Sequence, residues 1–217
     1  MKKALSPQTV AALVPDGARI MIGGFMGVGT PRRMIDALVA VGRRDLTLIA
    51  NDTAMPGRGI GKLITARAVK RLIVSHIGLN PETQQQMNDG SLDVELMPQG
   101  TLVECIRAGG MGLGGVVTPT GLGTGLEDGK RILEIGGKRF LLEAPISADF
   151  AVIAARQADY LGNLEYSLTA QNFNPIMAMS ADTVIAEPEH IVPVGVIPPD
   201  AVRTPAILVD HLIERSR

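Results

Sequence analysis

The sequence predicts an α/β fold built on a mostly parallel sheet with flanking helices. Along the first half of the chain, short apolar segments alternate with segments of helical spacing, which is the order of βαβ units. The apolar segments are continuous rather than alternating, which indicates strands buried on both faces. The first of them runs directly into a glycine-rich loop. With 217 residues, the chain is expected to form a single domain, residues 1–217.

Helix starts and glycine stops define the elements of this first half. Ser6 and Pro7 predict a short helix that runs toward residue 14. A second helix is expected over residues 30–41, with Thr30 as its cap and Pro31 at its first position. The other expected helices cover residues 60–66, 80–90 and 99–108, and the expected strands cover residues 18–22, 46–50, 69–75 and 93–97.

The loop after the first strand is a candidate ligand site. It consists of Gly23, Gly24, Phe25, Met26, Gly27, Val28 and Gly29. Glycines adopt backbone angles that other residues avoid and let a ligand approach the main chain closely. The start of the next helix would add free N–H groups, which hold anionic or oxyanion-forming ligands. The alternative is a tight strand-to-helix turn without a ligand.

Two familiar phosphate-binding motifs are excluded. The dinucleotide motif G-x-G-x-x-G fails because Arg32 stands where the third glycine or alanine belongs. The P-loop motif fails at Gly129 and Lys130, because position 124 is Thr124 and Arg131 follows instead of Ser or Thr. The loop therefore holds a ligand of a different kind, if it holds one.

Polar residues follow three further predicted strands. They are Asn51 and Asp52, Ser75 and His76, and Pro98 and Gln99. Because the carboxyl ends of parallel strands meet at one edge of a sheet, we expect these residues to gather beside the glycine loop. Asn51, His76 and Gln99 are thus candidates for a substrate pocket. Each has a structural alternative: Asn51 can close a turn, His76 can be a lone structural histidine, and Gln99 can cap a helix.

The second half of the chain is expected to differ in character. Residues 109–129 hold nine glycines and are expected to form a long loop without regular structure. Gly136 and Gly137 stand between two strand-like segments and predict a hairpin over residues 131–143. The sequence then predicts a strand over residues 150–154 in a new sheet region, a helix over 172–180, a strand over 183–187, an extended proline-rich tail and a closing strand or short helix over 207–213.

Composition and charge exclude several classes of function. A net charge of −1, from 21 basic and 22 acidic side chains, gives no field that favours nucleic acid or anionic lipid. Aromatic residues make up 3%, with no Trp, so little surface is available for stacking on bases. No apolar run approaches the roughly 18 residues of a membrane span, and the start lacks the apolar core of a signal peptide. We expect no nucleic-acid partner, no membrane and a cytoplasmic location.

Metal and thiol chemistry are not indicated either. Cys105 is the one cysteine, and it stands among apolar residues of an expected helix. His76, His190 and His211 show no ligand spacing, so no metal site is expected.

The glycine loop and its surroundings resemble the alpha subunits of family I CoA-transferases. Their motif D-G-x-x-(three apolar)-G-G-F-x-x-x-G-x-P is filled at every fixed position between Asp16 and Pro31. The Gly-Gly-Phe-Met-Gly run followed by Gly-Thr-Pro is similar to the acetate/acetoacetate type of alpha subunit. Further matching stretches, which extend the resemblance over nearly the whole chain, are residues 46–53, 98–102, 107–110, 118–121, 162–164 and 172–175.

The resemblance implies an enzyme with the three-layer CoA-transferase fold. Such an enzyme moves CoA between an acyl-CoA and a short-chain carboxylic or 3-oxo acid, through a glutamyl-CoA thioester. It also implies that residues 23–29 contact CoA. The family's glutamate stands in a Ser-Glu-Asn-Gly motif that this sequence lacks, so the resemblance places the catalytic residue on a partner beta subunit and none in this chain. A two-plus-two heterotetramer with the active site at the subunit interface is the implied assembly.

The acidic residues of this chain fit that division. The candidates weighed as nucleophiles are Glu82, Glu104, Glu127, Glu143 and Glu165, and each is expected to be a surface or ion-paired carboxylate. Two other readings stay open. One keeps the family and changes the acid to 3-oxoadipate with succinyl-CoA as donor. The other is a non-catalytic ligand-binding protein on the same scaffold.

Overall fold

A nine-stranded sheet forms the centre of the protein, a computed structural model that describes residues 2–214. Its strand order is β1-β12-β11-β9-β2-β3-β4-β5, with β10 antiparallel to β9 and every other pairing parallel. The strands are β1 (Ala4–Leu5), β2 (Arg19–Ile22), β3 (Leu46–Asp52), β4 (Val69–His76), β5 (Asp93–Leu96), β9 (Ala148–Asp159), β10 (Leu164–Glu165), β11 (Ala181–Val192) and β12 (His211–Ile213). The predicted mostly parallel sheet is confirmed.

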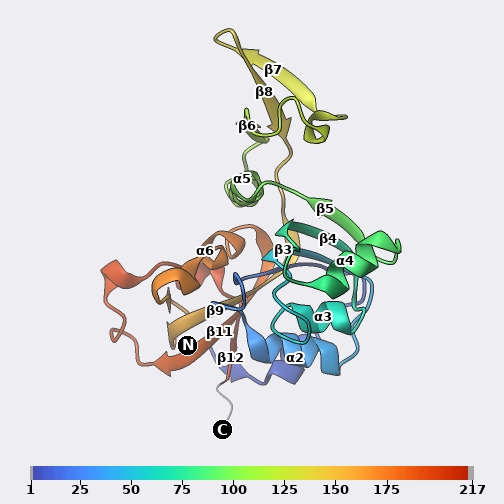
Figure 1. Ribbon diagram of the computed structural model, residues 1–217. Coiled ribbons are helices and arrows are strands. Elements are labelled where there is room, and N and C mark those ends of the chain that lie inside the picture. Colours follow the sequence, from blue (N-terminus) through green and yellow to red (C-terminus); the bar gives the residue numbers. More distant parts are fainter. Residues whose placement is uncertain (1, 215–217) are drawn as a thin grey trace.

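Helices cover both faces of this sheet and complete three layers (Figure 1). One face carries α1 (Pro7–Ala11), α2 (Arg32–Ala40), α3 (Gly61–Thr65) and α4 (Pro81–Asn88), and the other carries α5 (Gln99–Gly110) and α6 (Asn174–Met177). Successive strand residues point to opposite faces, so each strand supplies both layers. Ile20 and Ile22 belong to the core under α1 to α4, whereas Met21 belongs to the core under α5 and α6. The predicted three-layer α/β fold is confirmed.

The strand order reverses between the two central strands, β2 and β9. From β2 the chain adds β3, β4 and β5 on one side, and from β9 it adds β11 and β12 on the other. β2 stops at Ile22 opposite Val152, but β9 continues through Asp159. The chain that leaves β2 therefore turns beside a strand that runs on. Ligands of α/β proteins bind at such a switch point, beyond the carboxyl ends of the strands.

A second, three-stranded sheet projects from the body beyond α5 (Figure 1). It consists of β6 (Val116–Thr118), β7 (Arg131–Ile135) and β8 (Lys138–Glu143), in the antiparallel order β6-β8-β7. We call residues 116–143 the arm. The predicted hairpin is confirmed, since Gly136 and Gly137 have φ values of 59° and 73°, which a type I′ turn requires.

The prediction of a structureless loop over residues 109–129 is wrong in three places. Helix α5 continues to Gly110, strand β6 forms at Val116–Thr118, and a 3-10 helix, η1, forms at Gly125–Glu127. Strand β6 pairs only with β8, more than twenty residues further along the chain. A three-residue strand among glycines is stabilised by that partner and not by its own sequence.

The C-terminal half corrects three more expectations. The strand expected over residues 150–154 in a new sheet region is β9, which lies in the main sheet between β2 and β11. The helix expected over 172–180 is only α6, because Asn172 has a φ of 22° and interrupts the helical path after η2 (Leu168–Gln171). Strand β11 continues beyond the expected residue 187, through Pro188 to Val192, and the Pro188 carbonyl accepts a bond of 2.7 Å from Arg33.

The tail is less extended than expected. It forms the 3-10 helices η3 (Pro199–Ala201) and η4 (Ala206–Leu208) before β12. The closing segment, residues 207–213, therefore contains both the short helix and the strand that the sequence left as alternatives.

Candidate functional site

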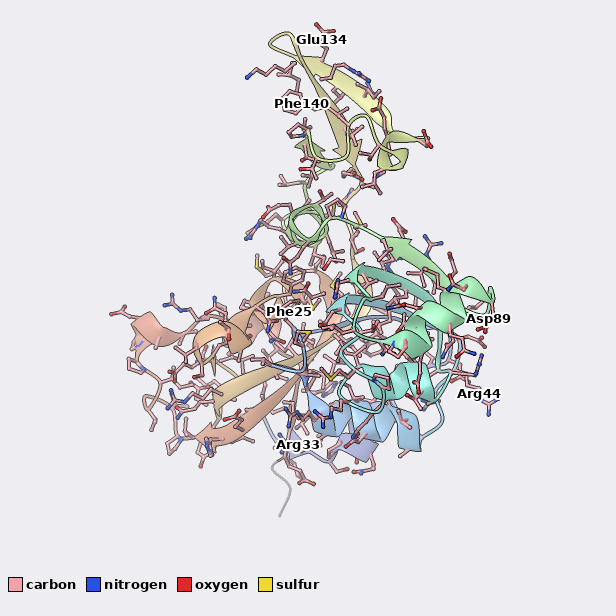
Figure 2. The ribbon with its side chains drawn as sticks, in the orientation of Figure 1. Phe25, Arg33, Arg44, Asp89, Glu134 and Phe140 are labelled. Carbon is pink, nitrogen blue, oxygen red and sulfur yellow. The ribbon has the colours of Figure 1, made fainter. Side chains whose placement is uncertain are left out.

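The glycine loop folds into a tight hairpin at the switch point. Phe25 and Val28 exchange two backbone hydrogen bonds, of 3.0 and 2.9 Å. Met26 and Gly27, at the turn, have φ values of 53° and 82°, which is the type I′ pattern. The side chains of Phe25, Met26 and Val28 are 41%, 40% and 49% exposed, so they are not core residues. Figure 2 shows Phe25 between α6 and β3. The hairpin therefore has an exposed apolar tip.

Asn172 joins both strands of this hairpin through its side-chain amide. Its Oδ1 accepts a bond from the Gly24 N–H (3.1 Å), and its Nδ2 donates to the Val28 carbonyl (3.1 Å). Its Oδ1 also accepts from the N–H of Phe173 (2.7 Å), which stabilises the unusual backbone of Asn172 itself. A side chain 148 residues away along the chain thus sets the width of the hairpin.

Asn174 fastens the end of the loop to the sheet. It is fully buried, its Nδ2 donates to the Gly29 carbonyl (3.0 Å), and its Oδ1 accepts from the Ala154 N–H of β9 (3.1 Å). A Cβ added to Gly23 would lie 1.8 Å from this Oδ1, so the asparagine fits only beside a glycine. We call Asn172 and Asn174 the amide clamp. Both asparagines stand in one of the stretches that carry the family resemblance, but no sequence pattern predicts this role for them.

Asp52 holds the tip of the hairpin. Its Oδ2 accepts a bond of 2.8 Å from the Met26 N–H, which stabilises the positive φ of that residue. Burial raises the pKa of the Asp52 carboxyl, and hydrogen bonds from the N–H groups of Met26 and Ala54 and the nearby His76 oppose the rise. A buried carboxylate at the end of β3 is thus used to support the loop.

The start of helix α2 differs from the prediction. Pro31, not Thr30, is the cap residue, no side-chain cap bond is made, and the helix begins one residue later than expected. Its first N–H groups are not free for a ligand, because those of Arg33 (3.1 Å) and Met34 (2.8 Å) donate to the carboxylate of Glu187. The expectation of a ring of free helix donors is therefore wrong at these two groups.

Glu187 is a site residue that the sequence analysis missed. It lies on β11, is nearly buried, and also forms an ion pair with Arg33 at 3.4 Å. Burial raises the pKa of its carboxyl, and the bonds from Met34 and Arg33 oppose the rise. The sequence signal for Glu187 was its position as an acidic residue at the end of a predicted apolar strand. No pattern in the neighbouring sequence connects this residue to helix α2.

Asn51 and Gln99 meet on the other side of the hairpin, as the topology predicts. The Oδ1 of Asn51 accepts a bond from Gln99 Nε2 (2.8 Å) and shares the one hydroxyl hydrogen of Ser75 (2.9 Å) with the Asn51 backbone carbonyl (2.6 Å). Both bonds use the oxygen, and no described residue accepts a bond from the Asn51 Nδ2. Because no fully buried side-chain nitrogen or oxygen in residues 2–214 lacks a partner, this Nδ2 has some exposed surface, and Asn51 is a lining residue of the adjoining cavity.

That cavity has a volume of 460 Å³ and an uncharged wall. Its lining residues are Phe25, Asn51, Gln99, Gly100, Val103, Thr169, Asn172 and Phe173. We call it the neutral pocket. Of the three predicted pocket residues, the structure brings Asn51 and Gln99 together here, whereas His76 is exposed at the end of β4 and does not line it.

A second cavity, of 440 Å³, lies on the opposite side of the hairpin and carries charge. Gly27, Val28 and Gly29 form one wall, and Arg33, Arg156 and Glu187 are among the other lining residues. Arg33 is already engaged, since its guanidinium donates to the carbonyls of Pro188 and Glu214, both at 2.7 Å. The hairpin thus separates a neutral pocket from a charged one.

The five glutamates weighed as nucleophiles line neither of these two cavities. Glu104, Glu127 and Glu143 form ion pairs with Arg107 (3.0 Å), Arg139 (2.6 Å) and Lys130 (2.7 Å). Glu82 accepts a bond from Thr65, and Glu165 is half-buried in β10. In residues 2–214, no three His, Cys, Asp or Glu side chains come together as a metal site would require, and no helix has the length and apolar character to cross a membrane.

Comparison with known proteins gives one consistent family. The family described as coenzyme A transferase matches residues 5–215. The chain is 52% identical over 211 residues to the acetate CoA-transferase subunit alpha of Escherichia coli, covering 97% of this chain and 96% of that protein. It is 48% identical over 212 residues to the acetoacetyl-CoA:acetate/butyrate CoA transferase alpha subunit of Clostridium acetobutylicum, covering 98% and 97%.

Among solved structures, the fold is similar to the acyl-CoA transferase YdiF of Escherichia coli O157:H7 in its thioester complex with CoA. The TM-score is 0.87 at 22% identity, and the match covers 98% of this chain and 47% of that one. The chain thus spans about half the length of YdiF.

The two hairpin glycines Gly27 and Gly29 provide a matched test of the clamp. Both have a positive φ, so alanine at either position costs about 1–2 kcal/mol of backbone strain. At Gly29, the added Cβ would also lie 2.3 Å from the Ala170 carbonyl, whereas at Gly27 it would meet no atom within 4 Å. We expect Gly29→Ala to lower the free energy of unfolding by about 1–3 kcal/mol more than Gly27→Ala. Urea unfolding measures both, and equal losses would contradict the packing described here.

Asp52→Asn tests the support of the hairpin through its pH dependence. A carboxyl whose folded pKa is raised contributes stability that is complete below its unfolded value of 3.8 and is lost as the pH rises through the folded pKa. Asparagine keeps an acceptor for the Met26 N–H but carries no charge. The free energy of unfolding of Asp52→Asn, minus that of the wild type, should therefore rise with pH above 3.8 and then level off. Urea unfolding between about pH 4 and 7, with exposed Asp200→Asn as control, measures this; a difference that falls with pH contradicts the assignment.

Proposed function

Because this chain belongs to the coenzyme A transferase family, we propose that it is the alpha half of an enzyme that moves CoA between an acyl-CoA and a short-chain carboxylic or 3-oxo acid. The names of the two bacterial alpha subunits favour the acetate/acetoacetate type. The observation that carries the proposal is the neutral pocket, where an unused amide donor of Asn51 lies beside the apolar tip of a glycine hairpin.

The hairpin is proposed to hold the thioester end of CoA. The partly exposed Gly27 and Gly29 let the carrier approach the main chain, while Phe25, Met26 and Val28 offer apolar contact to its methylene groups. Gly23 and Gly24 are buried against Asn174 and Thr30 and are proposed to act by shaping the hairpin. The N–H groups of Gly24, Phe25, Met26 and Val28 already donate within the protein. Contact with CoA therefore depends on the shape and apolar surface of the hairpin more than on its backbone donors.

Asn51 and Gln99 are proposed to bind the oxygen of the reacting carbonyl or carboxylate. Attack of a carboxylate on a thioester places negative charge on the carbonyl oxygen, and a fixed amide donor stabilises that charge. The bonds from Gln99 and Ser75 fix the Oδ1 of Asn51 and leave its Nδ2 for this oxygen. An uncharged wall also raises the reactivity of an attacking carboxylate, because it replaces water around that group.

The attacking glutamate is proposed to come from a beta subunit. None of the acidic residues in the described part of the chain lines the neutral pocket, and the sequence has no Ser-Glu-Asn-Gly. The relatives are named alpha subunits, which supports a partner of this kind. We propose a two-plus-two assembly in the cytoplasm, with the neutral pocket at the subunit interface. The 3-oxoadipate alternative has less support, because none of the cationic residues between positions 2 and 214 lines the neutral pocket to pair with a second carboxylate.

Reconstitution tests the proposal. We expect the purified chain alone to transfer no CoA from acetoacetyl-CoA to labelled acetate. Mixing it with its beta subunit should give turnover. Turnover by the chain alone contradicts the proposed division, and no turnover with any acid by the assembled pair contradicts the proposed activity.

The same assay tests the donor of the neutral pocket. Asn51→Ala removes the Nδ2, so kcat in the assembled pair should fall by about 10²–10³-fold, the usual cost of one oxyanion donor. Asn88→Ala, at the end of helix α4 and away from the pocket, is the matched control. Equal kcat values in the two variants would remove Asn51 from the reaction.

A further inference from the structure

One face of the arm is apolar and partly exposed. Directly opposed residues of antiparallel strands share a face, and the pairs Leu133 with Phe140 and Val117 with Leu142 therefore fix its members. We call it the open face; its apolar side chains are Val117, Leu133, Ile135, Phe140 and Leu142. Ile135 is 53% exposed and Val117 is 41% exposed. Figure 2 shows Phe140 on the arm, away from the body.

The opposite face of the same sheet is covered by the chain itself. Leu141 is fully buried there, and its Cδ1 lies within 3.2 Å of where a Cβ on Gly121 would be, beside Leu126. Two ion pairs, Lys130 with Glu143 and Arg139 with Glu127, fasten the covering segment. A small antiparallel sheet is stable with one face buried and one face in water, and its water face is normally polar. The open face has the composition of a buried one.

The charges around the open face favour a partner other than a second copy. Arg131 and Lys138 lie on it, and its strand positions carry no acidic residue. Two such faces docked on each other would bring cations together, whereas a partner with carboxylates at its rim would pair with them. The acidic residue of β7, Glu134, lies on the covered side.

The open face also continues toward the neutral pocket. A groove of 260 Å³ lies between the start of α5 and strand β6, and Val117 and Gly100 both line it. Gly100 lines the neutral pocket as well. One surface therefore runs from the hairpin, past the start of α5, to the arm. A subunit that covers the neutral pocket would therefore also contact this surface.

We propose that the open face of the arm is a docking surface for the beta subunit, which presents apolar side chains with an acidic rim to it. This inference rests on the partner named in the proposed function. The arm would then add contacts with the beta subunit that lie away from the reacting atoms.

Cysteine protection tests the docking directly. The one native thiol, Cys105, is fully buried, and burial raises its pKa to about 11, so an introduced cysteine is the reactive one. Ile135→Cys places a thiol on the open face, and Ile132→Cys, at a residue 39% exposed on the opposite face of the same strand, is the matched control. Assembly with the beta subunit should slow maleimide labelling of Ile135→Cys by about tenfold or more, because a docked interface excludes reagent as it excludes water. Labelling of Ile132→Cys should not change.

A thiol-to-amine cross-linker on Ile135→Cys identifies the occupant. The expected product has the mass of this chain plus the beta subunit. A product of two copies of this chain, or protection of Ile135→Cys in the lone chain, overturns the proposal in favour of self-association. Unchanged labelling in a pair that turns over also overturns it and leaves the proposed function intact. Protection in a pair without turnover supports the docking surface and contradicts the function instead. Failure of the two chains to associate overturns the docking proposal.

Discussion

The amide clamp is the interaction on which the candidate site depends. Asn172 and Asn174 satisfy backbone groups at both ends of the glycine hairpin, and Asn174 also ties it to β9. Each such bond contributes about 0.5–1.5 kcal/mol net, but a buried group left without its partner costs about 1–3 kcal/mol. The hairpin is therefore stabilised mainly because other backbone conformations would leave these groups without hydrogen-bond partners. Its apolar tip and its two flanking cavities follow from that single arrangement.

The strand order explains why the clamp can reach the loop. β2 is short and β9 runs on beside it, so the chain leaving β2 lies against residues that come more than a hundred positions later. The same geometry brings Glu187 of β11 to the start of α2. This carboxylate takes up helix donors that would otherwise attract an anion. In the proposed function, recognition of a ligand therefore depends on the hairpin surface and on side-chain amides such as that of Asn51.

How much of this the sequence predicts depends on distance along the chain. The parallel sheet and the meeting of Asn51 with Gln99 follow from local periodicity and from the rule that strand ends share an edge, and both were predictable. The contacts of the amide clamp with the loop and of Glu187 with helix α2 were not predictable. Asn172, Asn174 and Glu187 make these contacts across 148, 145 and 153 residues of sequence. Strand β6 was missed for the same reason. Its three residues form a strand because they pair with β8, and their own sequence does not predict one. His76 shows the converse limit: its place at a strand end was correct, but side-chain direction kept it out of the neutral pocket.

Hydrogen exchange of the loop amides tests the clamp most directly. Asn172→Gly accepts the positive φ of this position and removes both the Oδ1 that accepts from the Gly24 N–H and the Nδ2 that donates to the Val28 carbonyl. If the clamp holds the hairpin, the N–H groups of Gly24, Phe25, Met26 and Val28 should exchange faster in this variant by about tenfold or more, while strands β3 and β4 keep their protection. Unchanged exchange at these four amides would show that the hairpin stands without the clamp and would contradict the account.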